Sequence, residues 1–132
     1  MMSERPAEGR HVLVVEDEMT IVVLIEDTLQ ALGADVVGPT AWLDAALQLA
    51  REAAIDLAVL DINIRGGNSY GVADVLAERG IPFVFCSGYG DWVVEPRHRD
   101  RPRLTKPFTG RELEGKVLEL LAAGTVAQPK RG

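Results

Sequence analysis

The chain has 132 residues, of which 47% are hydrophobic and 26% are charged, and its formal net charge is −6. These values are typical of one globular domain with a hydrophobic core and exclude a disordered polypeptide. No apolar run approaches the roughly 18 residues needed to cross a bilayer, and no signal peptide opens the chain, so we expect a cytoplasmic protein. The acidic charge argues against nucleic-acid binding, which needs a basic surface, and favours a protein partner.

Five apolar runs rich in β-branched residues predict five strands. They lie at Val12 to Val15, Val36 to Val37, Leu57 to Leu60 and Phe83 to Cys86, with a weaker run near Leu104. Because these runs are continuous and do not alternate with polar residues, each strand is expected to be covered on both faces, as in a parallel sheet. The lone cysteine, Cys86, is expected to be a small buried hydrophobe.

Segments with helical spacing lie between the strands. The first has Ile21, Ile25, Thr28 and Leu32 on one face, the second has Leu43, Ala46, Leu47 and Ala50, and the third has Val72, Val75, Leu76 and Arg79. The last begins at a Thr109–Glu112 capping box and continues with Leu113, Val117, Leu120 and Leu121. Where a further helix is due, residues 87–103 contain two glycines and two prolines, which predict a short or irregular fourth helix.

The alternation of strands and helices predicts a doubly wound α/β sheet, because crossovers between parallel strands are right-handed. At this length, the flavodoxin-like (βα)5 fold with strand order 2-1-3-4-5 fits best. We expect one folded domain over residues 10–123, with residues 1–9 and 124–132 as disordered tails.

Polar side chains follow the predicted strands at their carboxyl ends, where open α/β sheets bind their ligands. The first strand is followed by Glu16, Asp17 and Glu18, the third by Asp61 and Asn63, the fourth by Ser87 and the fifth by Lys106. Carboxylates of Asp17 and Asp61 on adjacent strands would raise each other's pKa unless a cation neutralises them. Mg²⁺ suits such a site, because it prefers few carboxylates together with water and phosphate oxygens, and the backbone carbonyl at Asn63 would add a ligand.

This set of residues is coherent as a site that accepts a phosphoryl group. Asp61 would be the nucleophile, Lys106 would hold one phosphoryl oxygen, and Ser87 would donate a hydrogen bond to another. Each residue also has a simpler interpretation when taken singly. Asp17 could cap a helix, Asp61 and Ser87 could form turns, and Lys106 could be a surface lysine. Their coincidence at one sheet edge favours the phosphoryl site.

Four motifs carry these residues: VVEDE at 14–18, LAVLDINI at 57–64, FVFCSGYG at 83–90 and LTKPF at 104–108. Together they resemble the receiver domain of two-component response regulators, over nearly the whole chain from about His11 to Leu121. The resemblance implies that Glu16 and Asp17 are the acidic pair at Mg²⁺, Asp61 is the phosphoacceptor, Ser87 is the switch hydroxyl and Lys106 is the phosphate-sensing lysine. It also implies a cis peptide at Lys106–Pro107.

Residues 85–89, Phe-Cys-Ser-Gly-Tyr, are similar to a signature of single-domain receivers that reads Phe-Ala-Thr-Gly with a Tyr close behind. Most receivers place an aromatic switch residue three positions before the lysine, where this chain has Arg103. Members of the subgroup also lack that aromatic and have a mobile fourth-helix region. How phosphorylation of Asp61 would reach a partner is therefore left open by the sequence.

Several basic residues gather in the predicted irregular region. They are Arg97, His98, Arg99, Arg101 and Arg103. We interpret this cluster as a solvated patch that could contact an acidic partner. Neither His98 nor His11 has a metal-ligand partner at helical spacing.

The resemblance implies a single-domain response regulator that takes a phosphoryl group on Asp61 from a sensor histidine kinase or phosphotransfer protein. It would catalyse only its own phosphorylation and slow dephosphorylation, and would signal to a downstream protein as a monomer or weak homodimer. The alternative is a phosphorylation-independent interaction module with the same fold. A hydrolase or flavin protein is disfavoured, because Glu16, Asp17 and Glu18 would repel a phosphate bound after the first strand.

Overall fold

The protein is seen here in a computed structural model that describes residues 5–88 and 95–127. Five parallel strands form one sheet in the order β2-β1-β3-β6-β7. Their bounds are β1 His11–Val15, β2 Asp35–Thr40, β3 Leu57–Asp61, β6 Phe83–Ser87 and β7 Arg103–Thr105. When only the five strands of this sheet are counted in chain order, β6 is the fourth strand and β7 the fifth. The observed order is then the predicted 2-1-3-4-5, so the flavodoxin-like fold is confirmed. A short hairpin that the sequence did not indicate, β4 Asn63–Ile64 with β5 Gly67–Asn68, follows β3.

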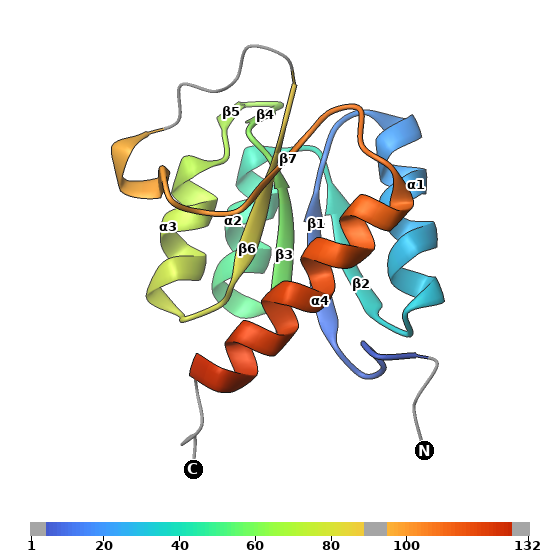
Figure 1. Cartoon of the computed structure of the whole chain (residues 1–132). Coiled ribbons are helices and arrows are strands. Elements are labelled where there is room, and N and C mark those ends of the chain that lie inside the picture. Colours follow the sequence, from blue (N-terminus) through green and yellow to red (C-terminus); the bar gives the residue numbers. More distant parts are fainter. Residues whose placement is uncertain (1–4, 89–94, 128–132) are drawn as a thin grey trace.

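Helices cover both faces of the sheet (Figure 1). On one face lie α1 Met19–Ala31 and α4 Gly110–Ala127, and on the other lie α2 Leu43–Glu52 and α3 Tyr70–Glu78. Side chains alternate between the faces of a strand, so Val12 and Val14 of β1 pack under α1 and α4, while Leu13 and Val15 pack under α2 and α3. Two covered faces explain why the strands read as continuous apolar runs.

The predicted inward face of α1 is partly confirmed. Ile25 and Leu32 are buried as predicted, Ile21 and Thr28 are half-buried, and Val22 and Leu29, which were not predicted, are buried as well. The sequence could not define this face, because residues 21–25 are apolar without interruption. The faces predicted for the second and third helices agree better with the structure, and buried positions include Ala46, Ala50, Val72 and Leu76.

Arg79 does not belong to the core face of α3 as predicted, because it is exposed. Its guanidinium instead donates from Nη1 to the backbone oxygens of Ala50, at 2.6 Å, and Ala53, at 3.0 Å. These carbonyls lie at the C-terminal end of α2, where backbone acceptors lack helical partners. Arg79 therefore ties the end of α3 to the end of α2.

The capping box at the start of α4 is confirmed. The N–H of Thr109 donates to Glu112 Oε1 at 2.8 Å, and the N–H of Glu112 donates to Thr109 Oγ1 at 3.1 Å. The helix continues to Ala127, past the predicted domain boundary at 123, and the disorder of the C-terminal tail stays a prediction. Residues 128–132 of that predicted tail lie outside the described residues.

The predicted disordered N-terminal tail is wrong for residues 5–9, which form a turn against the end of α1. Ala7 is fully buried and its N–H donates to the Leu32 oxygen at 2.8 Å. Gly33 lies under this turn with φ +90°, and a Cβ on it would meet Arg5 Cβ at 2.9 Å and Glu8 Cα at 3.0 Å. The sequence did not indicate this turn, because Ala7 is a single small apolar residue among charged residues and forms no periodic hydrophobic pattern.

His98 is buried, contrary to its interpretation as part of a solvated patch. Its ring stacks on Tyr70 at a centroid distance of 6.0 Å and lies edge-on to Phe83 and Phe85. Nε2 is 2.8 Å from Asp74 Oδ1 on α3. His98 ends the three-residue 3₁₀ helix Pro96–His98, the sole helix between residues 95 and 103, which agrees with the predicted short fourth helix.

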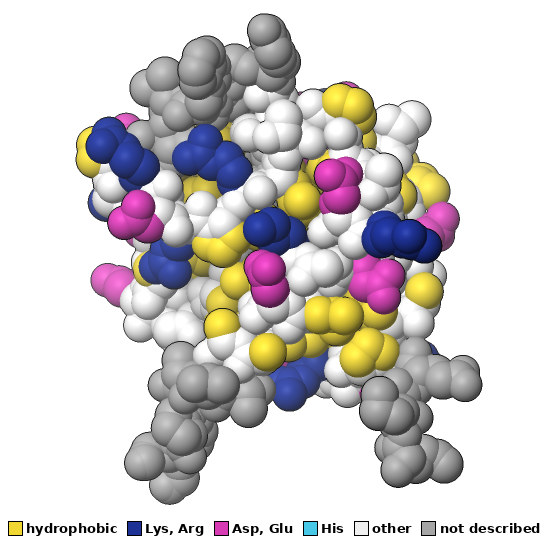
Figure 2. Space-filling model, viewed as in Figure 1, with side chains coloured by type: hydrophobic (Ala, Val, Ile, Leu, Met, Phe, Trp, Pro, Cys, Tyr) yellow, Lys and Arg dark blue, Asp and Glu magenta, His cyan; other side chains and the backbone are white. Residues whose placement is uncertain are grey.

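Arg97 lies on the surface beside His98 and ion-pairs with Asp74 and Glu95. On the face seen in Figure 2, acidic and basic side chains are interspersed among hydrophobic ones. No helix among the described residues is both long enough and apolar enough to cross a membrane.

A pair of glycine substitutions tests the packing of the N-terminal turn. We expect Gly33→Ala to destabilise the protein by more than about 1 kcal/mol, because Ala is strained at positive φ and its Cβ would meet backbone. Gly115→Ala, in exposed α4 with nothing within 4 Å of the new Cβ, should stabilise it by about 0.5–1 kcal/mol. Urea unfolding measures both changes, and equal effects at the two positions would contradict the assigned turn.

The burial of His98 is tested by truncation. His98→Ala should cost about 2–4 kcal/mol, because it removes the ring contacts and leaves Asp74 without one partner. Arg99→Ala, at the exposed neighbouring position, should change the free energy of unfolding by less than about 0.5 kcal/mol. Similar values for the two variants in urea unfolding would mean that His98 does not anchor this segment.

Candidate functional site

The candidate site lies at the carboxyl edge of the sheet, where four strands end side by side. Parallel pairing sets Val15 of β1 opposite Leu60 of β3, so the residues that follow them, Glu16 and Asp61, are neighbours. Asp61 is in turn paired with Cys86 of β6, immediately before Ser87. The register therefore gathers residues that are far apart in the sequence.

Three carboxylates meet at this edge. Glu16, Asp17 and Asp61 each offer an oxygen, and these oxygens all lie within 4.8 Å of one another. Glu16 and Asp61 are buried, and Asp17 is half-buried. Glu16 Oε1 is buried without a hydrogen-bond partner among the described residues. Since a buried acceptor without a donor is costly, this atom is oriented for a ligand that supplies positive charge.

Lys106 is the cation at the site. Its Nζ donates to Glu16 Oε2 and to Glu18 Oε1, each at 2.9 Å, and lies 3.4 Å from Asp61 Oδ2. Burial alone would lower the pKa of Lys106, but the hydrogen bonds to Glu16 and Glu18 and the Asp61 charge raise the pKa above its usual range. The lysine is therefore a permanent ammonium group beside the Asp61 carboxyl.

The pKa of Asp61 is raised to about 8, chiefly by burial and next by the negative charge of Glu16. Lys106 opposes this shift, while hydrogen bonding with Glu16 and Asp17 adds to it. One ammonium does not neutralise three clustered carboxylates, so the site favours additional positive charge.

A divalent cation fits this arrangement. Glu16, Asp17 and Asp61 provide hard oxygen donors, and the unpartnered Glu16 oxygen and the raised pKa of Asp61 mark a deficit of positive charge. The backbone carbonyl of Asn63 stays a predicted fourth donor. Asn63 itself is exposed and opens the β4–β5 hairpin directly after β3.

Ser87 is buried at the end of β6, and its backbone oxygen accepts a hydrogen bond from the Lys106 N–H at 2.8 Å. The predicted cis peptide at Lys106–Pro107 is present. Cys86 is buried as predicted, and burial raises the pKa of its thiol. Tyr89, the last residue of the subgroup signature, lies outside the described residues, so the subgroup stays a prediction.

The structure brings together Glu16, Asp17, Asp61 and Lys106 as the sequence predicted, with Ser87 next to Asp61's strand partner. Sequence reasoning missed the contact between Glu18 and Lys106. Its only sequence signal was a third acidic residue after the first strand, and a 2.9 Å side-chain contact cannot be deduced from that.

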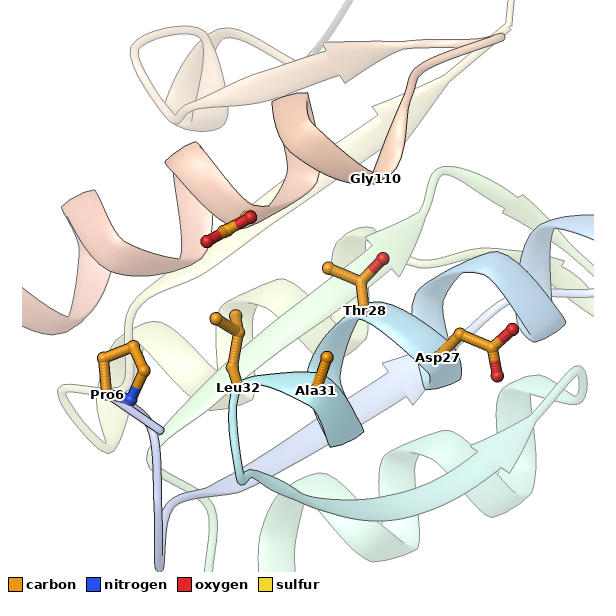
Figure 3. Close-up of a pocket in the computed structure, with 7 residues that line it drawn as sticks. Pro6, Asp27, Thr28, Ala31, Leu32 and Gly110 are labelled. Carbon is orange, nitrogen blue, oxygen red and sulfur yellow. The ribbon is translucent and has the colours of Figure 1, made fainter. Parts of the chain in front are cut away.

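A separate groove of about 400 Å³ lies between α1 and α4 (Figure 3). It is lined by Pro6, Asp27, Thr28, Ala31, Leu32, Gly110 and Glu114. In Figure 3 Thr28 points from α1 toward Gly110, where a Cβ would lie 3.1 Å from Thr28 Oγ1. The glycine thus permits a close approach of the two helices, and the groove shares no residue with the carboxylate cluster.

Comparisons with known proteins agree with this geometry. The family model described as response regulator receiver domain matches residues 12–118. The aerobic respiration control protein ArcA of Escherichia coli K12 is 30% identical over 129 residues, which cover 92% of this chain and 54% of ArcA. The chain thus spans about half the length of this curated relative.

Two solution structures of SdrG are also similar. SdrG from Sphingomonas melonis Fr1 is 44% identical, with a TM-score of 0.73 over 87% of this chain and 95% of SdrG. A structure described as the BeF3-activated conformation of SdrG from Pseudomonas melonis Fr1 is 42% identical, with a TM-score of 0.70 over 91% of this chain and 99% of the other.

The raised pKa of Asp61 predicts a specific dependence of stability on pH. Between about pH 4 and pH 8 the folded protein retains a proton that the unfolded chain releases, so this carboxyl lowers the free energy of unfolding as pH rises. We expect Asp61→Asn, without divalent cations, to become increasingly stabilising from pH 5 to pH 8, by at least about 1 kcal/mol.

Urea unfolding at the two pH values in the presence of a chelator measures this difference. Asp100→Asn, at an exposed position, is the matched control and should show no comparable trend. A stability difference between Asp61→Asn and wild type that does not change with pH would contradict the assigned environment of Asp61.

Proposed function

Because this chain belongs to the response regulator receiver domain family, we propose that Asp61 accepts a phosphoryl group and that the modified domain signals through altered protein contacts. The observation that carries the proposal is the Lys106 ammonium 3.4 Å from Asp61 Oδ2, within a cluster of carboxylates that can hold a cation. The same carboxylate thus has both an anion-binding group and a cation site beside it.

The proposed chemistry is nucleophilic. An Asp61 oxygen attacks the phosphorus of a phosphohistidine on the donor protein, a P–O bond forms, the P–N bond breaks, and the leaving imidazole takes a proton from solvent. Asp61 must be ionised to attack, and Lys106 favours the ionised form, while burial and Glu16 oppose it.

Mg²⁺ bound by Glu16, Asp17 and Asp61 would supply the positive charge that stabilises the ionised carboxylate and the incoming phosphoryl group. The backbone carbonyl of Asn63 would complete the protein's set of donors. Lys106 would contact a phosphoryl oxygen, and the Ser87 hydroxyl would donate to another, since Ser87 follows the strand position paired with Asp61.

The similarity to SdrG supports this assignment, since a chain 42% identical to this one is described in a BeF3-activated conformation. The match over 95% of SdrG also supports action as a regulator formed by this domain alone. By family, the proposed donor is a sensor histidine kinase or a phosphotransfer protein. A downstream protein target, a cytoplasmic location, and a monomeric or weakly dimeric state are further parts of the proposal.

A second candidate is an interaction module that works without phosphorylation. It is favoured by Arg103, which is half-buried in β7 where most receivers have the aromatic switch. The retained cluster of Asp61, Lys106 and the acidic pair favours the first candidate.

Phosphorylation by a small phosphodonor such as acetyl phosphate, followed by intact-protein mass spectrometry, tests the proposal. With Mg²⁺, wild type should gain one phosphoryl group, and Asp61→Asn or a chelator should abolish the gain. Lys106→Ala should slow it by about 10²-fold, because one preorganised positive donor is lost. Asp100→Asn should react like wild type.

A mass gain that survives Asp61→Asn would reject Asp61 as the acceptor. No gain in wild type, together with target binding that phosphodonor does not alter, would favour the module that works without phosphorylation.

A further inference from the structure

The Lys106 ammonium has three hydrogens to donate, and carboxylates surround it on three sides. It contacts Glu16 Oε2 and Glu18 Oε1 at 2.9 Å, and Asp61 Oδ2 lies at 3.4 Å. A phosphoryl group arriving at Asp61 would therefore compete with these carboxylates for the Lys106 ammonium. Which contact is given up depends on the environment of each carboxylate.

Glu16 and Asp61 are poor candidates for release. The Glu16 side chain is 0% exposed and that of Asp61 is 7% exposed. Either carboxylate, if withdrawn from Lys106, would leave its charge buried without the ammonium, which is costly. Glu16 Oε2 would keep only its hydrogen bond from the Glu18 N–H, at 3.1 Å, and Glu16 Oε1 already lacks a hydrogen-bond partner among the described residues.

Glu18 is different, because its side chain is 58% exposed. Its carboxylate would be hydrated as soon as it leaves the lysine, and exposed ion pairs are individually weak. Its backbone, by contrast, is fixed as the N-cap of α1, with its oxygen accepting from the N–H groups of Ile21 and Val22. Side-chain rotation alone therefore breaks the contact, without movement of the helix.

We propose that Glu18 is a positioning residue that competes with the phosphoryl group for Lys106 and so restrains phosphoryl acceptance at Asp61. This inference rests on the proposed function and extends it to the regulation of the same site. In the unmodified domain Glu18 holds the ammonium at the rim of the site. The arriving phosphoryl oxygen displaces Glu18, whose carboxylate turns to solvent.

Beryllofluoride with Mg²⁺ is the probe, because it binds the acceptor carboxylate as a tetrahedral phosphoryl mimic without being hydrolysed like an acyl phosphate. Glu18→Gln removes the competing charge and should raise beryllofluoride affinity about two- to fivefold, measured by ¹⁹F NMR titration. The initial rate of acetyl phosphate labelling should rise by a similar factor.

Glu18→Asp distinguishes the effect of direct contact with Lys106 from the effect of negative charge at this position, because it keeps the charge and shortens the side chain. The side chain is one methylene shorter, so it cannot span the distance to Lys106, and Asp at an N-cap position bonds to the first-turn N–H groups instead. If Glu18 acts by direct competition, Glu18→Asp should resemble Glu18→Gln. Asp27→Asn, which removes a charge at an exposed position of α1 that makes no contact with Lys106 in the described part of the chain, is the charge control and should match wild type.

Each outcome decides one of the two proposals. Equal beryllofluoride affinity in wild type and Glu18→Gln overturns the role of Glu18 and leaves the phosphoacceptor intact. Affinity that rises in Glu18→Gln and Asp27→Asn alike, or stays at the wild-type value in Glu18→Asp, also overturns it, because the effect would then be one of general charge. Absence of beryllofluoride binding in wild type rejects the proposed function, and the role of Glu18 with it.

Discussion

The site depends on one ammonium group held among carboxylates that would otherwise repel each other. Lys106 contacts Glu16 and Glu18 and lies beside Asp61, in a place where two of these carboxylates are almost inaccessible to water. Charges in such surroundings interact strongly, and leaving any of them unpaired is expensive. Lys106 reduces this cost without removing it, as the raised pKa of Asp61 indicates. The remaining deficit of positive charge is what makes the site receptive to a cation.

Sheet topology places these groups together, and local sequence does not. Lys106 is 90 residues from Glu16 along the chain, yet their side chains touch because β1, β3, β6 and β7 run parallel and end at one edge. The strands are apolar at almost every position, so the sheet is buried under helices on both sides and its register is firmly set. The polar residues of the site therefore lie where the apolar strands end, at the carboxyl edge of the sheet.

Sequence patterns predicted which polar residues lie at the ends of the strands. They did not predict contacts that depend on the conformation of individual side chains or on packing between distant segments. Asp61 and Lys106 could be placed because each follows an apolar strand, and strand order then made them neighbours. The face of α1 could not be fixed, since its first half is apolar all round. The burial of Ala7 and His98 depends on packing with residues far away in sequence, and neither stands in an apolar pattern. The contact of Glu18 with Lys106 belongs to the same class, because an exposed acidic residue has many possible rotamers.

The burial of His98 also limits how a change at Asp61 could be transmitted. An aromatic at position 103 would be attached to β7 itself, and a change of side-chain rotamer would move it. In this chain Arg103 stands there, and the ring that packs against Phe83 and Phe85 of β6 comes from His98. Moving that ring requires breaking its contact with Asp74 on α3 and exposing a buried side chain, which costs more than a change of rotamer. Signalling through this face would therefore have to displace the segment that carries His98, since rotation of a single residue would not be enough.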